Sequence, residues 1–184
     1  MVIKHASRKD IAALTAVETA CFPPAEAATE KEFIDRVQYY GNHFWLLYEG
    51  DKLLAFVDGF VTDEPDLTDV MYEDAALHNE QGAWQMIFGV NTLPEYRRHG
   101  YAGQLLRRAV ADARQQGRKG LVLTCKERLL PYYAKFGFQD EVMTDKSTME
   151  MPRGTRCGCR FDKSELAAAE QLFSTFSTFF RKST

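Results

Sequence analysis

The residues best suited to chemistry lie between 96 and 103, where the sequence reads YRRHGYAG. A segment with helical periodicity follows, and the first amides of a helix have no hydrogen-bond partner inside it. Glycines also let the backbone approach a ligand closely. The loop therefore predicts an anion site that would fit a pyrophosphate. The residues expected to form this site are Arg97, Arg98, His99, Gly100, Tyr101, Ala102 and Gly103.

The glycine spacing of this loop excludes two common phosphate motifs. It lacks the G-x-G-x-x-G of dinucleotide-binding folds and the Gly-Lys-Ser/Thr ending of the P-loop. The context is more informative, because a buried strand precedes the loop and a helix, a second strand and the segment PYYAKFGF follow it.

The elements before this loop follow local signals. Residues 2–5 resemble a short strand, and Ser7 and Thr29 each precede an acid by three residues, which predicts two capped helices. Residues 43–49 and 52–63 flank Gly50-Asp51 and favour an antiparallel hairpin. Residues 63–80 are rich in acids and are expected to form a long exposed connection.

The elements after residue 80 alternate. Residues 84–93 and 120–125 read as strands joined by a helix over 103–116, which is typical of a parallel pair. Residues 127–138 predict a short helix ending at Gly137, and 139–151 the last strands. The fold class is therefore α/β (α+β, mixed sheet), with helices on both faces.

The carboxyl-terminal segment changes in pattern. We expect a domain over residues 1–151 and an extension over 152–184, in which residues 153–163 are turn-like and 164–180 form an amphipathic helix. This helix would pack on the domain or on a second copy of the chain, so a homodimer is one expected assembly.

Composition limits the partners. The chain has 184 residues, 45% of them hydrophobic, and a net charge of -3, which indicates one globular domain without an extended basic face for nucleic acid. Its four cysteines lack zinc-ribbon spacing, so no metal site is expected and the thiols are expected to be reduced. The sequence has no apolar run near 18 residues, so we expect a cytoplasmic protein without a membrane segment.

Two motifs together resemble the GCN5-related N-acetyltransferase (GNAT) superfamily. Its R/Q-x-x-G-x-G/A signature is similar to residues 97–102, and its Y-x-x-x-G-F element is similar to residues 133–138. Within the superfamily, residues 123–138 (LTCKERLLPYYAKFGF) resemble the arylalkylamine (serotonin) N-acetyltransferases most. Residues 18–33 and 67–82 resemble that subfamily more weakly.

The resemblance implies roles for particular positions. Acetyl-CoA would lie where two parallel strands splay, with its pantetheine arm on the backbone of Val90, Asn91 and Thr92 and its pyrophosphate on the amides of residues 98–103. Tyr133 would stand beside the sulfur and protonate the departing thiolate, for which a phenol is a suitable donor. Tyr133 is alternatively a core aromatic.

The proton acceptor is the open question. Animal members of this subfamily carry two histidines where this chain has Met86 and Phe88, and neither side chain can take a proton. A protonated amine must lose a proton before it attacks a thioester. The alternatives are His78, Glu73, Asp74 and Glu26, and His78 is carried forward as the catalytic candidate, although a loop or packing role fits it equally.

The acceptor is expected to be a primary amine that attacks acetyl-CoA directly. An acidic entrance formed by residues 63–80 would attract a cationic amine, or the segment is only a soluble loop. Aromatic side chains that would line an amine pocket, or fill the core, are Phe22, Phe44, Trp84 and Phe88. Cys125 lacks a sequence cue for an activated nucleophile. The rival functions are acetylation of a polyamine or a protein amine, and a coenzyme-A-binding module without turnover.

Overall fold

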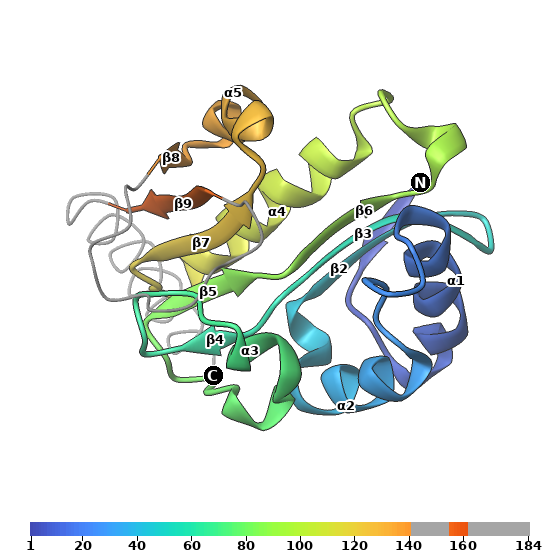
Figure 1. Cartoon of the computed structure of the whole chain (residues 1–184), viewed down its shortest axis with the longest axis horizontal. Coiled ribbons are helices and arrows are strands. Elements are labelled where there is room, and N and C mark those ends of the chain that lie inside the picture. The colour runs from blue at the N-terminus through green and yellow to red at the C-terminus, as the bar shows by residue number, and fades with distance from the viewer. Residues whose placement is uncertain (141–154, 162–184) are drawn as a thin grey trace, which may run out of the picture.

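Two β-sheets lie at the centre of the protein, whose computed structural model describes residues 1–140 and 155–161 (Figure 1). The first sheet has the order β1-β2-β3-β6 and is antiparallel throughout. The second has the order β4-β5-β7-β9-β8, in which β5 and β7 are parallel. The strands are β1 (Val2–Lys4), β2 (Phe44–Glu49), β3 (Lys52–Asp58), β4 (Val61–Thr62), β5 (Trp84–Ile87), β6 (Gly89–Thr92), β7 (Gly120–Cys125), β8 (Gln139–Asp140) and β9 (Thr155–Arg160).

The two sheets arise because two expected strands are each broken. β3 and β4 are separated at Gly59, and β5 and β6 at Phe88. A Cβ atom at Gly59 would lie 1.8 Å from the carbonyl oxygen of Met86, so only glycine allows these strands to cross so closely. The prediction of one continuous strand over 84–93 is therefore wrong, and the hairpin strand after Gly50 likewise ends at Asp58.

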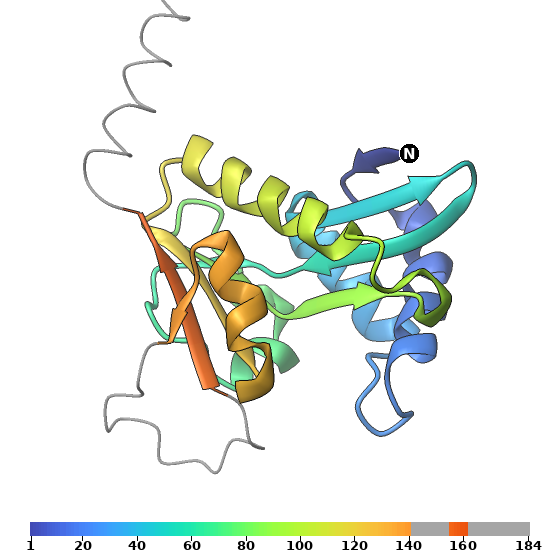
Figure 2. The same ribbon diagram turned by 90° about the horizontal axis from the view of Figure 1, so that it is seen from above.

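Helices cover both faces of the first sheet. Figure 2 shows α4 on one side of β2, β3 and β6 and α1 with α2 on the other. The α-helices are α1 (Ile11–Cys21), α2 (Glu30–Tyr40), α3 (Val70–Glu73), α4 (Tyr101–Gln115) and α5 (Leu130–Tyr133). Short 3-10 turns are η1 (Arg8–Asp10), η2 (Gly41–His43), η3 (Ala75–Leu77), η4 (Pro94–Tyr96), η5 (Glu127–Leu129) and η6 (Ala134–Phe136).

Both predicted capping boxes form. The Ser7 amide donates to Asp10 Oδ2 over 2.9 Å at the start of η1, which runs into α1. At α2 the Thr29 amide donates to Glu32 Oε2 over 2.7 Å, and the Glu32 amide donates back to the Thr29 hydroxyl. These reciprocal bonds satisfy amides that have no partner inside the helix, which explains why each element begins there.

A separate apolar core fills each face. One core packs α4, through side chains such as Leu105 and Leu106, against Trp45 and Val57. The other packs α1 and α2 on the opposite face around Phe33 and other aromatic side chains. The buried indole of Trp45 also donates to Asp112 of α4 over 2.8 Å, which fixes that helix on the sheet.

The segment after residue 154 differs from the expectation. Residues 155–160 were expected to be turn-like, but they form β9, which pairs with both β7 and β8. The second sheet therefore includes residues beyond 151. Of the strands expected over 139–151, β8 is present at Gln139–Asp140, and the remainder lies outside the described residues, as does the helix expected over 164–180.

Candidate active site

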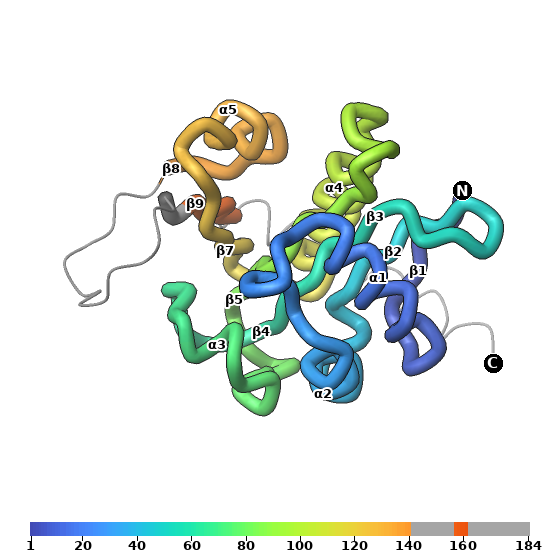
Figure 3. The backbone as a smooth tube through the Cα atoms, turned by 45° about the vertical axis from the view of Figure 1, so that its right-hand side comes forward, coloured from blue at the N-terminus to red at the C-terminus, as the bar shows by residue number. Residues whose placement is uncertain are grey.

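The two sheets separate at the end of β5, and this separation opens an edge on each side. β5 pairs with β7 from Trp84 to Ile87, whereas β6 pairs with β3 alone and is the last strand of its sheet. On the β5 side, the pairing of β7 ends at Leu123, two residues before the strand does. Figure 1 shows β6 and β7 running apart beyond β5, and Figure 3 shows α5 over β7 with α4 to one side. An unpaired strand edge offers backbone amides and carbonyls to a ligand.

The loop predicted to bind an anion lies at the far end of β6 and leads into α4. Gly100 is the residue before the helix and has φ 82°, a left-handed conformation that glycine adopts without strain. Arg98 has φ 69° and is the only non-glycine residue with positive φ in the described chain. The first free amides of α4 therefore follow a sharply turned loop, which is the geometry of an anion site at a helix start.

The side chains of this loop differ partly from the expectation. Arg97 Nε donates to the carbonyl of Thr92 over 3.2 Å, and His99 Nδ1 lies 2.9 Å from the carbonyl of Arg97. Arg97 thus braces the loop against β6, and His99 braces the loop against itself. Gly103 serves packing, because a Cβ there would lie 3.1 Å from the ring of Phe136.

The three residues predicted for the pantetheine arm lie on β6, but they are not equivalent. The carbonyl of Thr92 accepts from Cys21 Sγ as well as from Arg97. The side chain of Asn91 points to the α1 face, where its Nδ2 donates to Glu18 Oε2 over 2.5 Å. Val90 packs against the α4 core instead.

Tyr133, the predicted proton donor, lies at the end of α5 and is 7% exposed. Its ring packs edge-on against Tyr132 and Phe138, with centroids 5.2 and 6.0 Å away. Burial raises the pKa of its phenol, with a smaller effect from the Cys125 thiol. The group therefore stays protonated near neutral pH, as a proton donor must.

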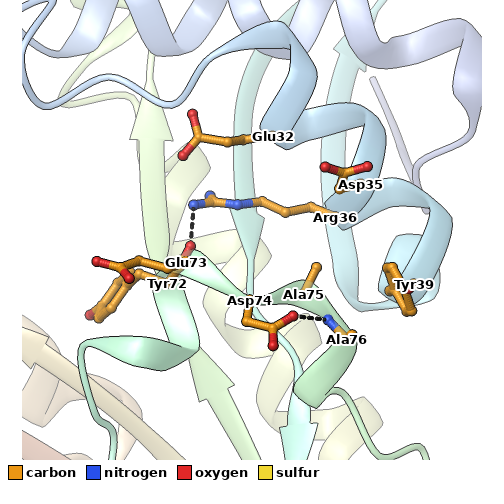
Figure 4. Close-up of a pocket in the computed structure, with 9 residues that line it drawn as sticks. All are labelled: Glu32, Asp35, Arg36, Tyr39, Tyr72, Glu73, Asp74, Ala75 and Ala76. Carbon is orange, nitrogen blue, oxygen red and sulfur yellow. Dashed lines mark hydrogen bonds between the residues drawn. The ribbon is translucent and has the colours of Figure 1, made fainter.

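A pocket of about 270 Å³ lies between α2 and the segment that contains α3. This is the side of the first sheet opposite α4 (Figure 2). Figure 4 shows Arg36 reaching across it to the carbonyl of Tyr72, to which it donates over 3.2 Å. Four carboxylates against one guanidinium make the pocket acidic. Its lining residues are Glu32, Asp35, Arg36, Tyr39, Tyr72, Glu73, Asp74, Ala75 and Ala76.

Tyr72 lines the pocket and also contacts residues beside the strand break. The Tyr72 ring stacks at an angle on Phe88, 4.8 Å between centroids, and its hydroxyl lies 3.1 Å from Thr124 Oγ1 on β7. Phe88 occupies the break between β5 and β6. Of the other aromatic side chains considered for an amine pocket, Phe44 and Trp84 are buried in the core and Phe22 is exposed.

Sequence reasoning missed a buried polar cluster behind the strand break. Asp58 Oδ2 lies 3.5 Å from Arg36 Nη1, and the Gly89 amide donates to the same carboxyl. Glu18 of α1 and Asn91 complete the cluster. Burial raises the pKa of Asp58 to about 7 and also raises that of Glu18. Each acid interrupts an apolar stretch of the sequence, and this was the available signal.

His78, the predicted proton acceptor, uses both ring nitrogens within the protein. The Val61 amide donates to its Nδ1 over 3.1 Å, and its Nε2 lies 3.2 Å from Glu80 Oε2. Since Nδ1 accepts, Nε2 carries the proton. His43 Nε2 approaches the same Glu80 oxygen at 3.0 Å. These three residues are close enough to hold a metal ion, but a metal on Nε2 would require a proton on Nδ1, which the Val61 bond excludes.

The other predicted acids lie on the surface. Glu73 and Asp74 line the acidic pocket, and the Asp74 carboxylate caps the Ala76 amide over 2.9 Å. Glu26 is exposed between α1 and α2. The segment over 63–80 is mostly exposed as expected, although it contains α3 and buries Met71. Within the described ranges, no helix has the length and apolarity needed to span a membrane.

The comparison with known proteins identifies the class. The model of the Acetyltransferase (GNAT) family matches residues 11–138. The chain therefore belongs to this family, and the predictions of its fold, of acyltransferase activity and of acetyl-CoA as co-substrate agree with that membership. The family is broader than the arylalkylamine acetyltransferases, so the subfamily stays a prediction.

Several solved structures share the fold. The chain is similar to the loading GNATL domain of CurA from Lyngbya majuscula, with 19% identity and a TM-score of 0.70 over 86% of this chain and 96% of that one. It is similar to the GphF GNAT-like decarboxylase in complex with isobutyryl-CoA, with 20% identity and a TM-score of 0.72 over 87% and 99%. It is also similar to Arabidopsis thaliana Naa50 in complex with a bisubstrate analogue, with 19% identity and a TM-score of 0.64 over 87% and 98%. No curated protein sequence matches the chain.

Proposed function

We propose that the protein transfers the acetyl group of acetyl-CoA to a small primary amine by direct attack. The proposal rests on one observation: the turned loop before α4 and the acidic pocket lie at two sides of the break between β5 and β6. The turned loop at Gly100 follows one end of β6, and Tyr72, which lines the acidic pocket, packs on Phe88 at the other end. A coenzyme and an amine would thus approach the same place from opposite faces, which is the arrangement that a direct transfer needs.

The coenzyme would lie along the open edge of β6. The amides of residues 98–103 would hold its pyrophosphate, and the backbone of Val90, Asn91 and Thr92 would hold its pantetheine arm. A strand amide near Val90 or Asn91 would polarise the thioester carbonyl. Tyr133 would give a proton to the departing thiolate, for which its buried, protonated phenol is suited.

The acceptor would enter from the acidic pocket. Carboxylates attract an ammonium group and raise its local concentration, and Tyr72 with Phe88 provides aromatic surface beside the strand break. An arylalkylamine uses both features. The charge of the pocket also favours a polyamine, which is the second candidate, because four carboxylates exceed what one ammonium group needs.

Release of free thiol from acetyl-CoA, measured with a panel of amines, tests the proposal. We expect turnover with tryptamine or phenethylamine if the acceptor is an arylalkylamine, and with spermidine if it is a polyamine. A lysine-containing peptide tests a protein amine. Thermal stabilisation by acetyl-CoA without thiol release for any amine would indicate a binding module and overturn the proposed transfer.

A further inference from the structure

The cluster behind the strand break has more hydrogen-bond acceptors than the surrounding protein satisfies. Asp58 Oδ2 and Asn91 Oδ1 are both buried, and neither accepts a hydrogen bond from any described residue. Buried acceptors without a donor are rare, because each loses its hydrogen bonds to water and gains none in the protein. The cluster also holds two carboxylates, Asp58 and Glu18, against the one guanidinium of Arg36. It is thus short of a proton and a donor.

The position of Asp58 relates this shortage to the reaction. Asp58 is the last residue of β3 and pairs with Gly89, the first residue of β6 after the break. A Cβ at Gly89 would lie 2.5 Å from Asp58 Oδ1. Because glycine has no side chain, the Asp58 carboxyl can pack directly against the backbone of β6. Arg36, which contacts Asp58, is only 12% exposed and lines the acidic pocket. One side chain therefore links the pocket to the buried carboxyl.

We infer that Asp58 accepts the proton that the acceptor ammonium loses before it attacks the thioester. This inference rests on the proposed function. The ammonium gives one proton to the Asp58 carboxylate, and the neutral nitrogen forms a bond to the acetyl carbon as the carbon–sulfur bond breaks. The thiolate takes a proton from Tyr133, and the second proton lost by the nitrogen replaces it. Asp58 then releases its proton to solvent through the pocket lined by Arg36.

The groups around Asp58 suit this role. Burial raises its pKa to about 7, the Arg36 guanidinium opposes that rise, and the Glu18 carboxylate adds to it. Tyr40 and Tyr72 are close enough to Asp58 to interact with its charge. Burial raises the pKa of both hydroxyls, so neither is charged near neutral pH. A base with a pKa near the working pH is the most effective proton acceptor.

The pH dependence of turnover tests the inference with the full chain, acetyl-CoA and the best amine of the panel. We expect wild-type kcat/KM to rise with pH through a limb near 7, as Asp58 ionises. Asp58→Asn is expected to lower turnover at pH 7 by about 100-fold or more and to remove this limb, with acetyl-CoA affinity within about threefold of wild type. A variant that keeps both the turnover and the limb would overturn the role of Asp58.

Two further variants separate this role from a structural one. Asp10→Asn removes another buried carboxylate, in the capping box of η1, and is expected to leave the limb in place. Arg36→Gln removes the neighbouring cation, so the limb is expected to move to higher pH. A limb that stays fixed in Arg36→Gln argues against Asp58. A wild-type protein that binds acetyl-CoA but acetylates no amine would instead refute the proposed function itself.

Discussion

The hydroxyl of Tyr72 lies 3.1 Å from Thr124 Oγ1, and this hydrogen bond joins α3 to β7 where the two sheets separate. Tyr72 comes from the acidic segment, and Thr124 is one of the two residues of β7 beyond its pairing with β5. The bond therefore holds one wall of the acidic pocket against β7, the strand beside which the thioester is proposed to lie.

Loss of this bond is expected to affect the amine more than the coenzyme. Tyr72→Phe keeps the ring on Phe88 but removes the bond, which should cost about 1 kcal/mol of stability. We expect a higher KM for the amine and an unchanged dissociation constant for acetyl-CoA, measured by steady-state kinetics and calorimetry. Tyr39→Phe, at the exposed rim of the same pocket, is the control. An unchanged amine KM would show that Tyr72 does not position the acceptor.

The role of Tyr133 makes a second prediction. Tyr133→Phe preserves the packing against Phe138 but removes the proton donor, so we expect turnover to fall by about 100-fold or more. Acetyl-CoA affinity should stay within about threefold, because binding does not use the hydroxyl proton. Tyr132→Phe, the same change one residue earlier, should retain turnover. Equal losses in the two variants would indicate packing rather than proton transfer.

The anion loop offers a matched pair of glycines. Gly100 and Gly117 lie at opposite ends of α4, both have positive φ, and neither would bring a Cβ within 4 Å of another atom. A side chain at either position should cost a similar strain of about 1–2 kcal/mol. Only Gly100→Glu places a negative charge at the start of the helix, where the pyrophosphate would lie.

Binding of acetyl-CoA should therefore separate the two variants. Calorimetry is expected to show no binding to Gly100→Glu and near wild-type affinity for Gly117→Glu, although both melt at lower temperature than the wild type. If Gly100→Glu still bound acetyl-CoA normally, the pyrophosphate would have to lie elsewhere, and the assignment of residues 98–103 would be lost.

Asp58 also makes a prediction about stability that does not depend on turnover. Its folded pKa of about 7 lies above the ordinary value of 3.8, so the folded state binds more protons between these values. The contribution of this group is present at low pH and is lost as pH rises through about 7. Asparagine has no charge to desolvate, so Asp58→Asn should gain stability relative to wild type from pH 5 to pH 8, by on the order of a few kcal/mol.

Denaturant unfolding at several pH values checks this, with Asp10→Asn as a control of opposite sign. The Asp10 pKa is lowered: burial raises it, but hydrogen bonds from Lys4 and Ser7 outweigh that effect. Asp10→Asn should therefore be less stable than wild type above about pH 4, and the difference should shrink in acid. A stability difference for Asp58→Asn that does not change with pH would mean that the carboxyl is not perturbed.

The elements with local signals were predictable from the sequence. Ser7 and Thr29 each find their capping partner three residues on, and the left-handed Gly100 starts α4 two residues before the expected start. These features depend on neighbours in the chain, so a single sequence contains the information.

The missed features depend on distant contacts. The break at Gly59 exists because another strand, at Met86, passes within reach of a Cβ. β9 forms because Cys157 aligns with Leu123, a pairing across more than thirty residues. Asp58 becomes a candidate only when Arg36 and Gly89 lie beside it. Charge within an apolar stretch marks such a residue, but the fold has to supply its partners.

The last prediction concerns His78, because the two candidate proton acceptors, His78 and Asp58, predict different turnover for a His78 variant. If it takes the proton from the amine, His78→Gln should lower turnover by about 100-fold. If Asp58 does so, turnover should stay within a few-fold and stability should fall by about 1–3 kcal/mol, because the bonds to Val61 and Glu80 are disturbed.

The pH dependence of stability distinguishes these effects at His78. Burial, with the charge of His43, lowers the pKa of His78 below 6.5, so the unfolded state binds more protons in mild acid. The stability that His78 contributes is present above pH 6.5 and is lost as pH falls through the lowered pKa. Glutamine does not titrate, so unfolding of His78→Gln should lose part of this acid sensitivity. A variant with wild-type acid sensitivity and a large loss of turnover would return the proton transfer to His78 and remove it from Asp58.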